Sequence, residues 1–443
     1  MKFINCNPNR QFREIGLRLY IYGYANISDE ELLKLLDEDL KFDHIRGQFA
    51  FVYIREKKWI ACVDHICTTQ LFYSKNFICP SLHVLAKKEV EQRDGLALHR
   101  DSRSYKIRSV MGEYVPGTIT PYEQITRLDM ETYVENGEAV QYADVCKEPT
   151  RDFDIDEAYD LFVNATKRIG VGNDTILFSG GKESVFLTML YKHLGYEPSL
   201  VHITSPNKKH SVDDTSCSLL RAIDWDIHTH EIEKSGPYTE EDKEVFCSKY
   251  WCDNTHPPKL NAVYMRTGRK TSGEVGTVDN QRSTYSSLFV NYMDDIHPGI
   301  AIDLHLMRSS VNNNKHVPMS YDVKKFDRYA KNNPEEWDYL RTYWGDKIKS
   351  IPKSPMYSHY MFLLQYNSSH RLYAQSQDHY NEWYNIFADY EIYNLFLNLD
   401  WKYKEGDIQK KTLYDIAKSK FGEHFTDIPW QLPIAGLGVP NVI

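Results

Sequence analysis

Residues 175–184 have the sequence Thr-Ile-Leu-Phe-Ser-Gly-Gly-Lys-Glu-Ser, which predicts a short apolar strand, a tight turn and the start of a helix. Gly180 and Gly181 carry no Cβ, so the backbone N–H groups of the turn can approach an anion closely. The hydroxyls of Ser179 and Ser184 add donors, and the helix expected directly after the turn points its positive end at the same place. The stretch therefore predicts a phosphate-binding turn, with an ordinary glycine connection as the alternative.

The turn differs from the Walker A phosphate loop, whose pattern is Gly-x4-Gly-Lys-Ser/Thr. Here Ile176 occupies the position of the first glycine, and Glu183 follows Lys182 where a hydroxyl residue belongs. We therefore expect a phosphate site of another kind.

Length and composition limit the kind of protein. The chain has 443 residues, enough for two or three domains, and 42% of them are hydrophobic, enough for large cores. A net charge of −9 argues against a nucleic-acid partner bound through bulk electrostatics. No apolar run reaches the roughly 18 residues of a membrane-spanning helix, and the N-terminus has no apolar signal segment. The eight cysteines are scattered, so we expect reduced thiols and a cytoplasmic protein.

Short β-like runs dominate the first third of the chain. Leu19–Tyr24 predicts one strand, and residues 49–63 predict a hairpin around a charged turn. A short amphipathic helix is expected from about Ser28 to Asp39, because Ser28 and Glu31 have the spacing of a capping box.

Three segments of this region resemble the signature of the asparagine synthetases: Gly47–Val52, Val63–His65 and Gln70–Tyr73. Gly112–Thr120 resembles the segment that closes the same domain in that family. The resemblance implies that residues 1–147 form a class II glutamine amidotransferase domain, an α+β domain with antiparallel β layers.

Two departures from that family affect its chemistry. The family hydrolyses glutamine with a cysteine at residue 2, whose free α-amino group acts as the base, whereas this chain has Lys2. Cys6 lies nearby, but it carries a peptide nitrogen. The Asn-Gly-Glu segment that holds glutamine in the family is also missing. We therefore expect residues 1–147 to have kept the fold and lost the glutaminase site.

From residue 148 onward, strand and helix patterns alternate, which predicts an α/β fold with a parallel sheet flanked by helices. In such a sheet, ligands bind outside the carboxyl ends of the strands, which is where the glycine turn lies. The C-terminal part, from about residue 300, is rich in aromatic residues and is expected to be mainly helical. The expected helices are 155–169, 182–194 and 213–223, and the expected strands are 175–178, 199–204 and 228–232.

The glycine turn resembles the Ser-Gly-Gly-x-Asp-Ser loop of the PP-loop ATP pyrophosphatases, with Glu183 in place of the aspartate. Those enzymes cleave ATP between the α and β phosphates. The next family segment, Ser-Gly-Glu-Gly-x-Asp-Glu, is matched in part by Thr271–Asp279. The resemblance implies that ATP is held by Ser179, Gly180, Gly181, Lys182, Glu183, Ser184, Ser272, Gly273 and Glu274.

A magnesium ion is implied beside the phosphates. Mg²⁺ takes oxygen ligands and usually one or two carboxylates. Glu183 is the first candidate ligand, and Asp279 competes with Glu274 for the second position. A zinc site within Cys247–His256 is the weaker alternative, because the spacing of its cysteines and histidine is not that of a common zinc knuckle.

Two C-terminal segments complete the resemblance. Glu382–Tyr390 resembles the synthetase block Glu-x-Arg-x-Pro-Phe-Leu-Asp-His and keeps its Glu, Phe and Asp in register. Gly406–Leu413 resembles the segment Gly-Lys-x-x-Lys-x-x-Leu, and Lys410 falls on the lysine that reaches the ATP phosphates. A lysine there offsets the charge that builds on pyrophosphate in the transition state. Glu382 and Lys410 are therefore the candidate catalytic residues.

The chain thus resembles asparagine synthetase homologues of the β-lactam synthetase and lasso-peptide cyclase type, with a non-catalytic amidotransferase domain. The resemblance implies an ATP-dependent ligase that adenylates a small-molecule or peptide carboxylate, releases pyrophosphate and lets an amine displace AMP. One alternative is a PP-loop enzyme that modifies a nucleobase or tRNA, and another is an ATP-binding scaffold without turnover. The two substrates and the formation of a homo-oligomer stay open.

Overall fold

In a computed structural model of the protein, the described residues fall into several ranges. We call the part up to residue 142 the sandwich, and the part from residue 150 the parallel-sheet unit. The structure describes residues 1–5, 12–65, 67, 69–99, 118–129, 131–142, 150–169, 175–177, 182–204, 227–231, 270–271, 331–332, 334–335, 338, 383–384, 386–400, 403 and 411–422.

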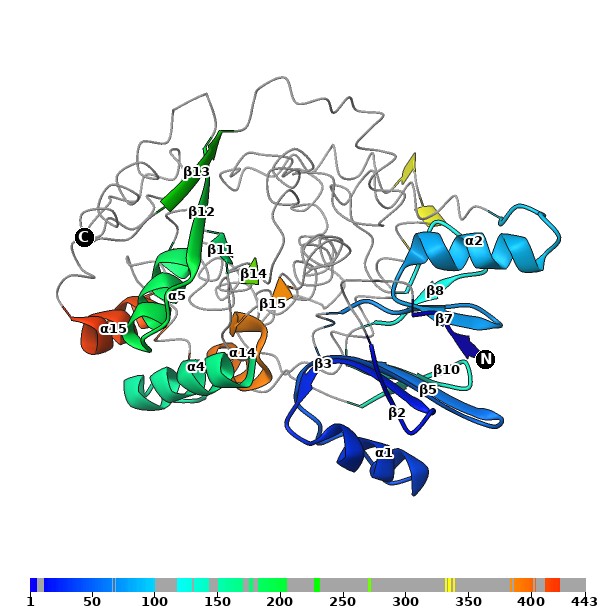
Figure 1. The fold of residues 1–443 in the computed structure, drawn as a ribbon, viewed down its shortest axis with the longest axis horizontal. Helices are drawn as coiled ribbons and strands as arrows, with labels where there is room; N and C mark the ends of the chain where they lie inside the picture. Colours follow the sequence, from blue (N-terminus) through cyan, green and yellow to red (C-terminus); the bar gives the residue numbers. More distant parts are fainter. Residues whose placement is uncertain are drawn as a thin grey trace.

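The sandwich consists of two β-sheets that face each other (Figure 1). The larger sheet is antiparallel, in the order β10 (Glu138–Gln141), β9 (Thr132–Glu135), β5 (Lys58–Val63), β4 (Gly47–Arg55), β3 (Leu19–Ala25) and β2 (Arg13–Ile15). The smaller sheet has the order β1 (Lys2–Phe3), β7 (Phe77–Cys79), β6 (Phe72–Tyr73) and β8 (Thr126–Arg127), with β1 and β7 parallel.

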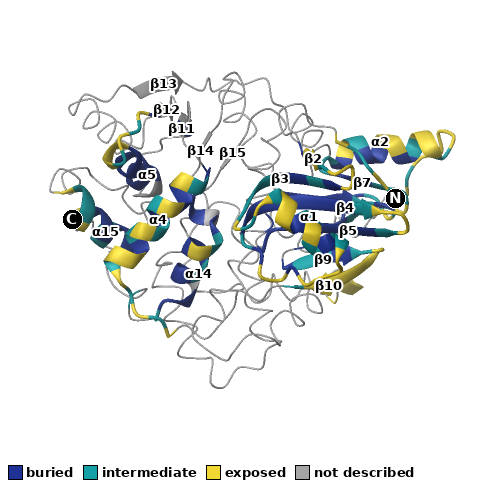
Figure 2. Cartoon of the chain, turned by 60° about the horizontal axis from the view of Figure 1, so that its bottom comes forward, coloured by how far each residue is buried: buried dark blue, intermediate teal, exposed yellow. Residues whose placement is uncertain are grey.

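One helix covers the outer face of each sheet, so the sandwich has four layers (Figure 1). Helix α1 (Asp29–Asp37) packs on the larger sheet, and α2 (Leu82–Gln92) packs on the smaller one. Strand β4 is buried on both faces (Figure 2): Ala50 and Val52 point into the core between the sheets, whereas Phe49, Phe51 and Tyr53 point toward α1. The alternation of a strand's side chains explains this division.

The local predictions for this region are confirmed. The hairpin joins β4 to β5 and pairs Arg55 with Lys58 at the charged turn. Helix α1 begins with the expected capping box: the Ser28 hydroxyl accepts a hydrogen bond from the backbone N–H of Glu31, and the Glu31 carboxylate accepts one from the backbone N–H of Ser28 at 2.8 Å. Hydrogen bonds donated to the Glu31 carboxylate by the backbone N–H and by the hydroxyl of Ser28 lower the pKa of Glu31.

The parallel-sheet unit contains a sheet in which all neighbouring strands are parallel. The strand order is β13 (Ile227–Glu231), β12 (Ser199–Thr204), β11 (Thr175–Leu177), β14 (Lys270–Thr271) and β15 (Trp383–Tyr384). The three predicted strands are β11, β12 and β13. The region that contains β15 was expected to be mainly helical. Residues 383–384 instead form a strand, because they pair with β14 at the edge of the sheet.

Helices of this unit surround an aromatic core. The helices are α4 (Ile155–Ile169), α5 (Lys182–His193), α14 (Tyr390–Asn398) and α15 (Lys411–Phe421), with a 3₁₀ turn η2 (Ile386–Ala388) before α14. The ring of Phe162 lies 4.7 Å from Phe186, 5.4 Å from Phe387 and 5.9 Å from Phe396, measured between centroids. Helix α15 packs against α4 and α5. The predicted helices 155–169 and 182–194 are therefore confirmed.

The whole is a mixed α/β protein with antiparallel and parallel sheets. Within the described ranges, no helix combines the length and apolar character needed to cross a membrane. Helix 213–223 of the sequence prediction lies outside the described residues.

Candidate functional site at the switch point of the parallel sheet

The chain reverses its direction of travel across the parallel sheet at β11. From β11 it passes through α5 to β12 on one side, whereas β14 occupies the other side. The register aligns Thr175 with both Ser199 and Lys270, and Ile176 with Leu200 and Thr271. In open α/β sheets, ligands bind outside the carboxyl ends of the strands at this kind of switch point.

Two predicted site segments follow the strands that meet there. Strand β11 ends at Leu177, two residues before Ser179, and α5 begins at Lys182. Strand β14 ends at Thr271, so Ser272 is the next residue in the chain. Because β11 and β14 are parallel neighbours, both segments follow the carboxyl ends of strands on the same side of the sheet.

The structure describes only part of the predicted nucleotide site. Ser184 lies in the first turn of α5 and is 4% exposed, and its carbonyl accepts a hydrogen bond from the Thr188 hydroxyl at 2.8 Å. Lys182 and Glu183 lie in the same turn, with side chains outside the description. The other predicted ligand, metal and catalytic residues stay predictions, since they lie outside the described residues: Ser179, Gly180, Gly181, Ser272, Gly273, Glu274, Asp279, Glu382 and Lys410, with Cys247, Cys252 and His256 of the zinc alternative.

The catalytic candidates adjoin described elements. Strand β15 begins at Trp383, directly after Glu382, and α15 begins at Lys411, directly after Lys410. Leu413 and Ile416 of α15 are fully buried, which anchors this helix in the core that it shares with α4 and α5. Helix α5 is also the helix that follows the glycine turn, and α15 packs against it through Phe421, whose ring lies 5.6 Å from Phe186 and 5.5 Å from His193 between centroids.

A buried polar contact lies between the sandwich and the parallel-sheet unit. The Asp389 carboxylate, 2% exposed, accepts hydrogen bonds from the Tyr24 hydroxyl at 2.9 Å and from the Arg168 guanidinium at 2.8 Å. Burial, together with the negative charge of Asp389, raises the pKa of Tyr24 well above its usual value. The sequence placed Asp389 in a family block, but no local signal marked Tyr24 or Arg168 as its partners.

One motif residue of the sandwich, Asp64, holds two strands of the larger sheet together. Asp64 follows β5 and is fully buried; its backbone N–H donates to the carbonyl of Phe49, and its carboxylate accepts from the N–H of Phe49 at 3.3 Å. Asp64 therefore holds β4 against the end of β5.

Lys2, at the position where the resemblance would place a nucleophilic cysteine, is exposed in edge strand β1.

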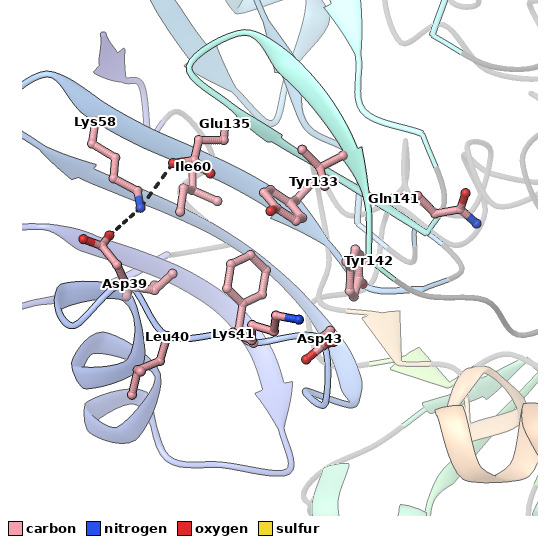
Figure 3. A pocket seen from close by; sticks show the side chains of 13 residues that line it. Asp39, Leu40, Lys41, Asp43, Lys58, Ile60, Tyr133, Glu135, Gln141 and Tyr142 are labelled. Carbon is pink, nitrogen blue, oxygen red and sulfur yellow. Dashed lines mark hydrogen bonds and ion pairs between the residues drawn. The ribbon is translucent and has the colours of Figure 1, made fainter.

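A separate pocket of about 330 Å³ lies on the outer side of the larger sheet, beside α1 (Figure 3). Phe42 and Tyr133 form part of its apolar lining, with ring centroids 4.9 Å apart. At one end, Lys58 contacts Asp39 at 2.5 Å and Glu135 at 3.2 Å. None of the predicted site residues lines this pocket, and Lys58 is neutralised by two carboxylates. Among the described residues, no cluster of histidines, cysteines and carboxylates could hold a metal ion.

Comparisons with known proteins add no family to these observations. Neither a scan against protein-family models nor a search of curated protein sequences gave a match.

Proposed function

We propose that the protein is an ATP-dependent, AMP-forming carbon–nitrogen ligase of the asparagine synthetase type that works without hydrolysing glutamine. The observation that carries this proposal is the place of the glycine turn. It directly follows β11, the strand at the switch point of a five-stranded parallel sheet, and the partly matching Ser272–Glu274 segment directly follows the neighbouring strand β14.

In this proposal, each of two domains has its own role. Residues 148–443 are the synthetase domain, and residues 1–147 are an amidotransferase-like domain that lacks the nucleophile. The four layers of the sandwich support that assignment, and Lys2 supports the loss of the glutaminase. The buried thiols of Cys62 and Cys79 support a reducing, cytoplasmic location.

The turn would bind the triphosphate through its backbone N–H groups and the hydroxyls of Ser179 and Ser184. A carboxylate oxygen of the substrate attacks the α-phosphorus, the bond to the bridging oxygen breaks, and pyrophosphate leaves with its electron pair. An amine then attacks the acyl carbon, AMP leaves, and the amine loses a proton. Holding both reactants in one cleft removes much of the entropy cost of their meeting.

The side chains proposed around the phosphates suit magnesium, because they are hard oxygen donors on segments that leave the same edge of the sheet. Glu183 and Asp279 would hold the ion, with Glu274 as the competitor for the second position. When bound, Mg²⁺ neutralises phosphate charge. Lys410 would offset the charge that develops on the leaving pyrophosphate, and Glu382 would orient or deprotonate the attacking amine.

Pyrophosphate release tests the proposal directly. The purified chain is incubated with Mg·ATP, a panel of carboxylic acids and a panel of amines that includes hydroxylamine, which traps acyl-adenylates as hydroxamates. We expect release that depends on one acid class, and transfer of ¹⁸O from a labelled carboxylate into AMP. Release that ignores the acid, or AMP without the label, contradicts the ligase.

Variants assign the site in the same assay. Ser179→Ala and Lys410→Ala are expected to abolish acid-dependent release while circular dichroism stays unchanged. Ser419→Ala and Lys418→Ala are the matched controls, because both residues are exposed on α15. Full activity in both site variants would refute the site assignment.

A second function is an ATP-binding scaffold without turnover. Glu183 replaces the family aspartate, and the segment Thr271–Asp279 matches its family pattern only in part. Tight nucleotide binding with no pyrophosphate in any pairing of acid and amine would favour it. Release that requires a nucleobase or tRNA would instead favour the PP-loop modifying enzymes, a class that the net charge of −9 does not support.

A further inference from the structure

We propose that the sandwich sets the geometry of the nucleotide site through a buried contact made by Tyr24, Asp389 and Arg168. This inference rests on the proposed function, and it gives the amidotransferase-like domain a task in place of glutamine hydrolysis. The three residues are positioning residues, since they act through the strands that carry the site.

One buried carboxylate holds three segments of the chain together. Arg168, the penultimate residue of α4, donates to Asp389 from Nη2 at 2.8 Å and from Nε at 3.2 Å. Tyr24 of β3 donates to Oδ2 at 2.9 Å, the carboxylate oxygen that also accepts from Nε of Arg168. Asp389 also caps α14, because it accepts a hydrogen bond from the backbone N–H of Glu391 at 3.1 Å. These hydrogen bonds and the ion pair compensate the cost of burying the Asp389 carboxylate.

Other residues of the sandwich reinforce this contact. The Gln48 side-chain amide donates to the Tyr24 hydroxyl at 3.2 Å, which fixes the direction of the hydroxyl. The Arg46 guanidinium lies 4.5 Å above the ring of Tyr390, the first residue of α14. His65 meets the same ring edge-on at 4.4 Å. The start of α14 is thus held by side chains of the sandwich on several sides.

The contact connects to the two strands that flank β14. Arg168 precedes β11 by a few residues, and Asp389 follows β15 after the short turn η2. In the sheet, β14 lies between β11 and β15. The ion pair therefore ties together the chain segments on both sides of the strand that leads to Ser272. The far end of α14 is held as well, since Arg151 exchanges backbone hydrogen bonds with Asn398 and Asp400 at 3.0 and 2.7 Å.

Loosening this contact changes the relative placement of β11 and β15, on which in-line attack at the α-phosphorus depends. Reacting groups displaced by about 1 Å lose rate steeply, while nucleotide binding by the turn itself is affected less. We expect a loss in kcat rather than a rise in the KM for ATP.

The test uses the full chain and two matched hydroxyl deletions. Tyr24→Phe removes the hydrogen bond to Asp389. Tyr53→Phe removes a hydrogen bond of the same kind, from Tyr53 to Asp37 at 2.7 Å, inside the sandwich and away from α14. We expect kcat for pyrophosphate release to fall about tenfold in Tyr24→Phe, with the KM for ATP within about twofold, and to stay unchanged in Tyr53→Phe. Arg168→Lys is expected to lower kcat similarly, because a lysine cannot make the two-pronged contact.

Hydrogen exchange gives a readout that does not depend on catalysis. In Tyr24→Phe, but not in Tyr53→Phe, amides of residues 386–398 and 175–177 are expected to exchange faster. Unchanged exchange in both segments, or equal kcat in the two variants, overturns the inference. If the wild-type chain releases no pyrophosphate, the ligase proposal is refuted. The hydrogen-exchange data then decide, without any activity, whether the sandwich positions α14 and β11 through Tyr24.

Discussion

The guanidinium of Arg168 meets the carboxylate of Asp389 as a fork, with Nη2 2.8 Å from Oδ1 and Nε 3.2 Å from Oδ2. Asp389 is 2% exposed, whereas the side chain of Arg168 is 30% exposed. Such planar, two-pronged pairs are among the stronger charged contacts in proteins. Asp389 also accepts a hydrogen bond from the hydroxyl of Tyr24, which belongs to the sandwich. Removing the Asp389 carboxylate should therefore destabilise both the sandwich and the parallel-sheet unit.

Asp389→Asn is expected to lower the free energy of unfolding by about 2–4 kcal/mol, because it removes the buried counter-charge of a half-buried guanidinium and leaves only the exposed carboxylate of Glu391. Urea unfolding, followed by tryptophan fluorescence, measures the change. Glu391→Gln is the control: this carboxylate also contacts Arg168, at 2.9 Å, but it is 50% exposed. An exposed pair contributes about 1 kcal/mol or less. Equal losses in the two variants would show that the buried fork has no special weight.

The Tyr24 hydroxyl gives the contact a dependence on alkaline pH. Burial and the charge of Asp389 raise its pKa above the usual value of 10.0. The folded protein therefore holds this proton more tightly than the unfolded chain, and the resulting stability is fully present below pH 10. It is lost as the pH rises through the folded-state pKa.

We expect the stability difference between wild type and Tyr24→Phe to be constant from about pH 7 to 9 and to shrink above pH 10. The comparison between the two proteins cancels the titration of other tyrosines. Thermal unfolding across this pH range measures the difference. A difference that persists unchanged beyond pH 11 would contradict a shared proton between the hydroxyl and Asp389.

The aromatic core of the parallel-sheet unit should be sensitive at Phe162. This ring is fully buried and lies within 6 Å of the rings of Phe186, Phe387 and Phe396. Phe162→Ala is expected to cost about 3–5 kcal/mol through lost burial and the remaining cavity. Phe162→Leu fills most of that space and should cost clearly less. Denaturant unfolding measures the loss of stability in both variants. Similar losses in the two would argue against tight packing around Phe162.

Local signals predicted many elements of this fold. Helix α1 was readable because Ser28 and Glu31 form a capping box, and α4 and β12 were readable because their apolar periodicity is strong. The β9–β10 hairpin carries a readable signal too, since Asn136-Gly137 is a favoured two-residue hairpin turn with positive φ at both positions.

The remaining features depend on contacts between distant parts of the chain. Strands β14 and β15 have two residues each, too few to show any alternation, and they form because the sheet offers them partners. The Tyr24–Asp389 hydrogen bond joins residues 365 positions apart. For the site, residue types alone predicted a phosphate turn, whereas the strand order that places it at a switch point came from the structure.

The buried thiols of the sandwich should be chemically silent. Burial raises the pKa of the Cys62 thiol well above its usual value, and Cys67 and Cys79 are buried as well. Because the thiolate is the reactive form, iodoacetamide at pH 8 should leave these three unmodified in the native protein and modify them in urea. Peptide mass spectrometry resolves each site. Rapid native modification of Cys62 would mean that the core between the layers opens readily.

Gly23 is expected to be the least replaceable residue of β3. It has φ +82°, and a Cβ built there would lie 1.9 Å from the carbonyl oxygen of Gln48 on the neighbouring strand. Gly137, in the β9–β10 turn, has φ +98° and nothing within 4 Å of a built Cβ. Both alanine variants carry the backbone strain of a left-handed conformation, about 1–2 kcal/mol. Only Gly23→Ala adds a collision with the backbone of β4.

Gly23→Ala should therefore lose more than about 4 kcal/mol or fail to fold, and the shift of β3 should also pull Tyr24 away from Asp389. Gly137→Ala should lose only the strain and keep the contact. Soluble yield, thermal midpoint and hydrogen exchange across residues 386–398 compare the two variants. Equal stability would contradict the close approach of β3 and β4, and faster exchange in Gly137→Ala would separate the exchange behaviour of α14 from the position of Tyr24.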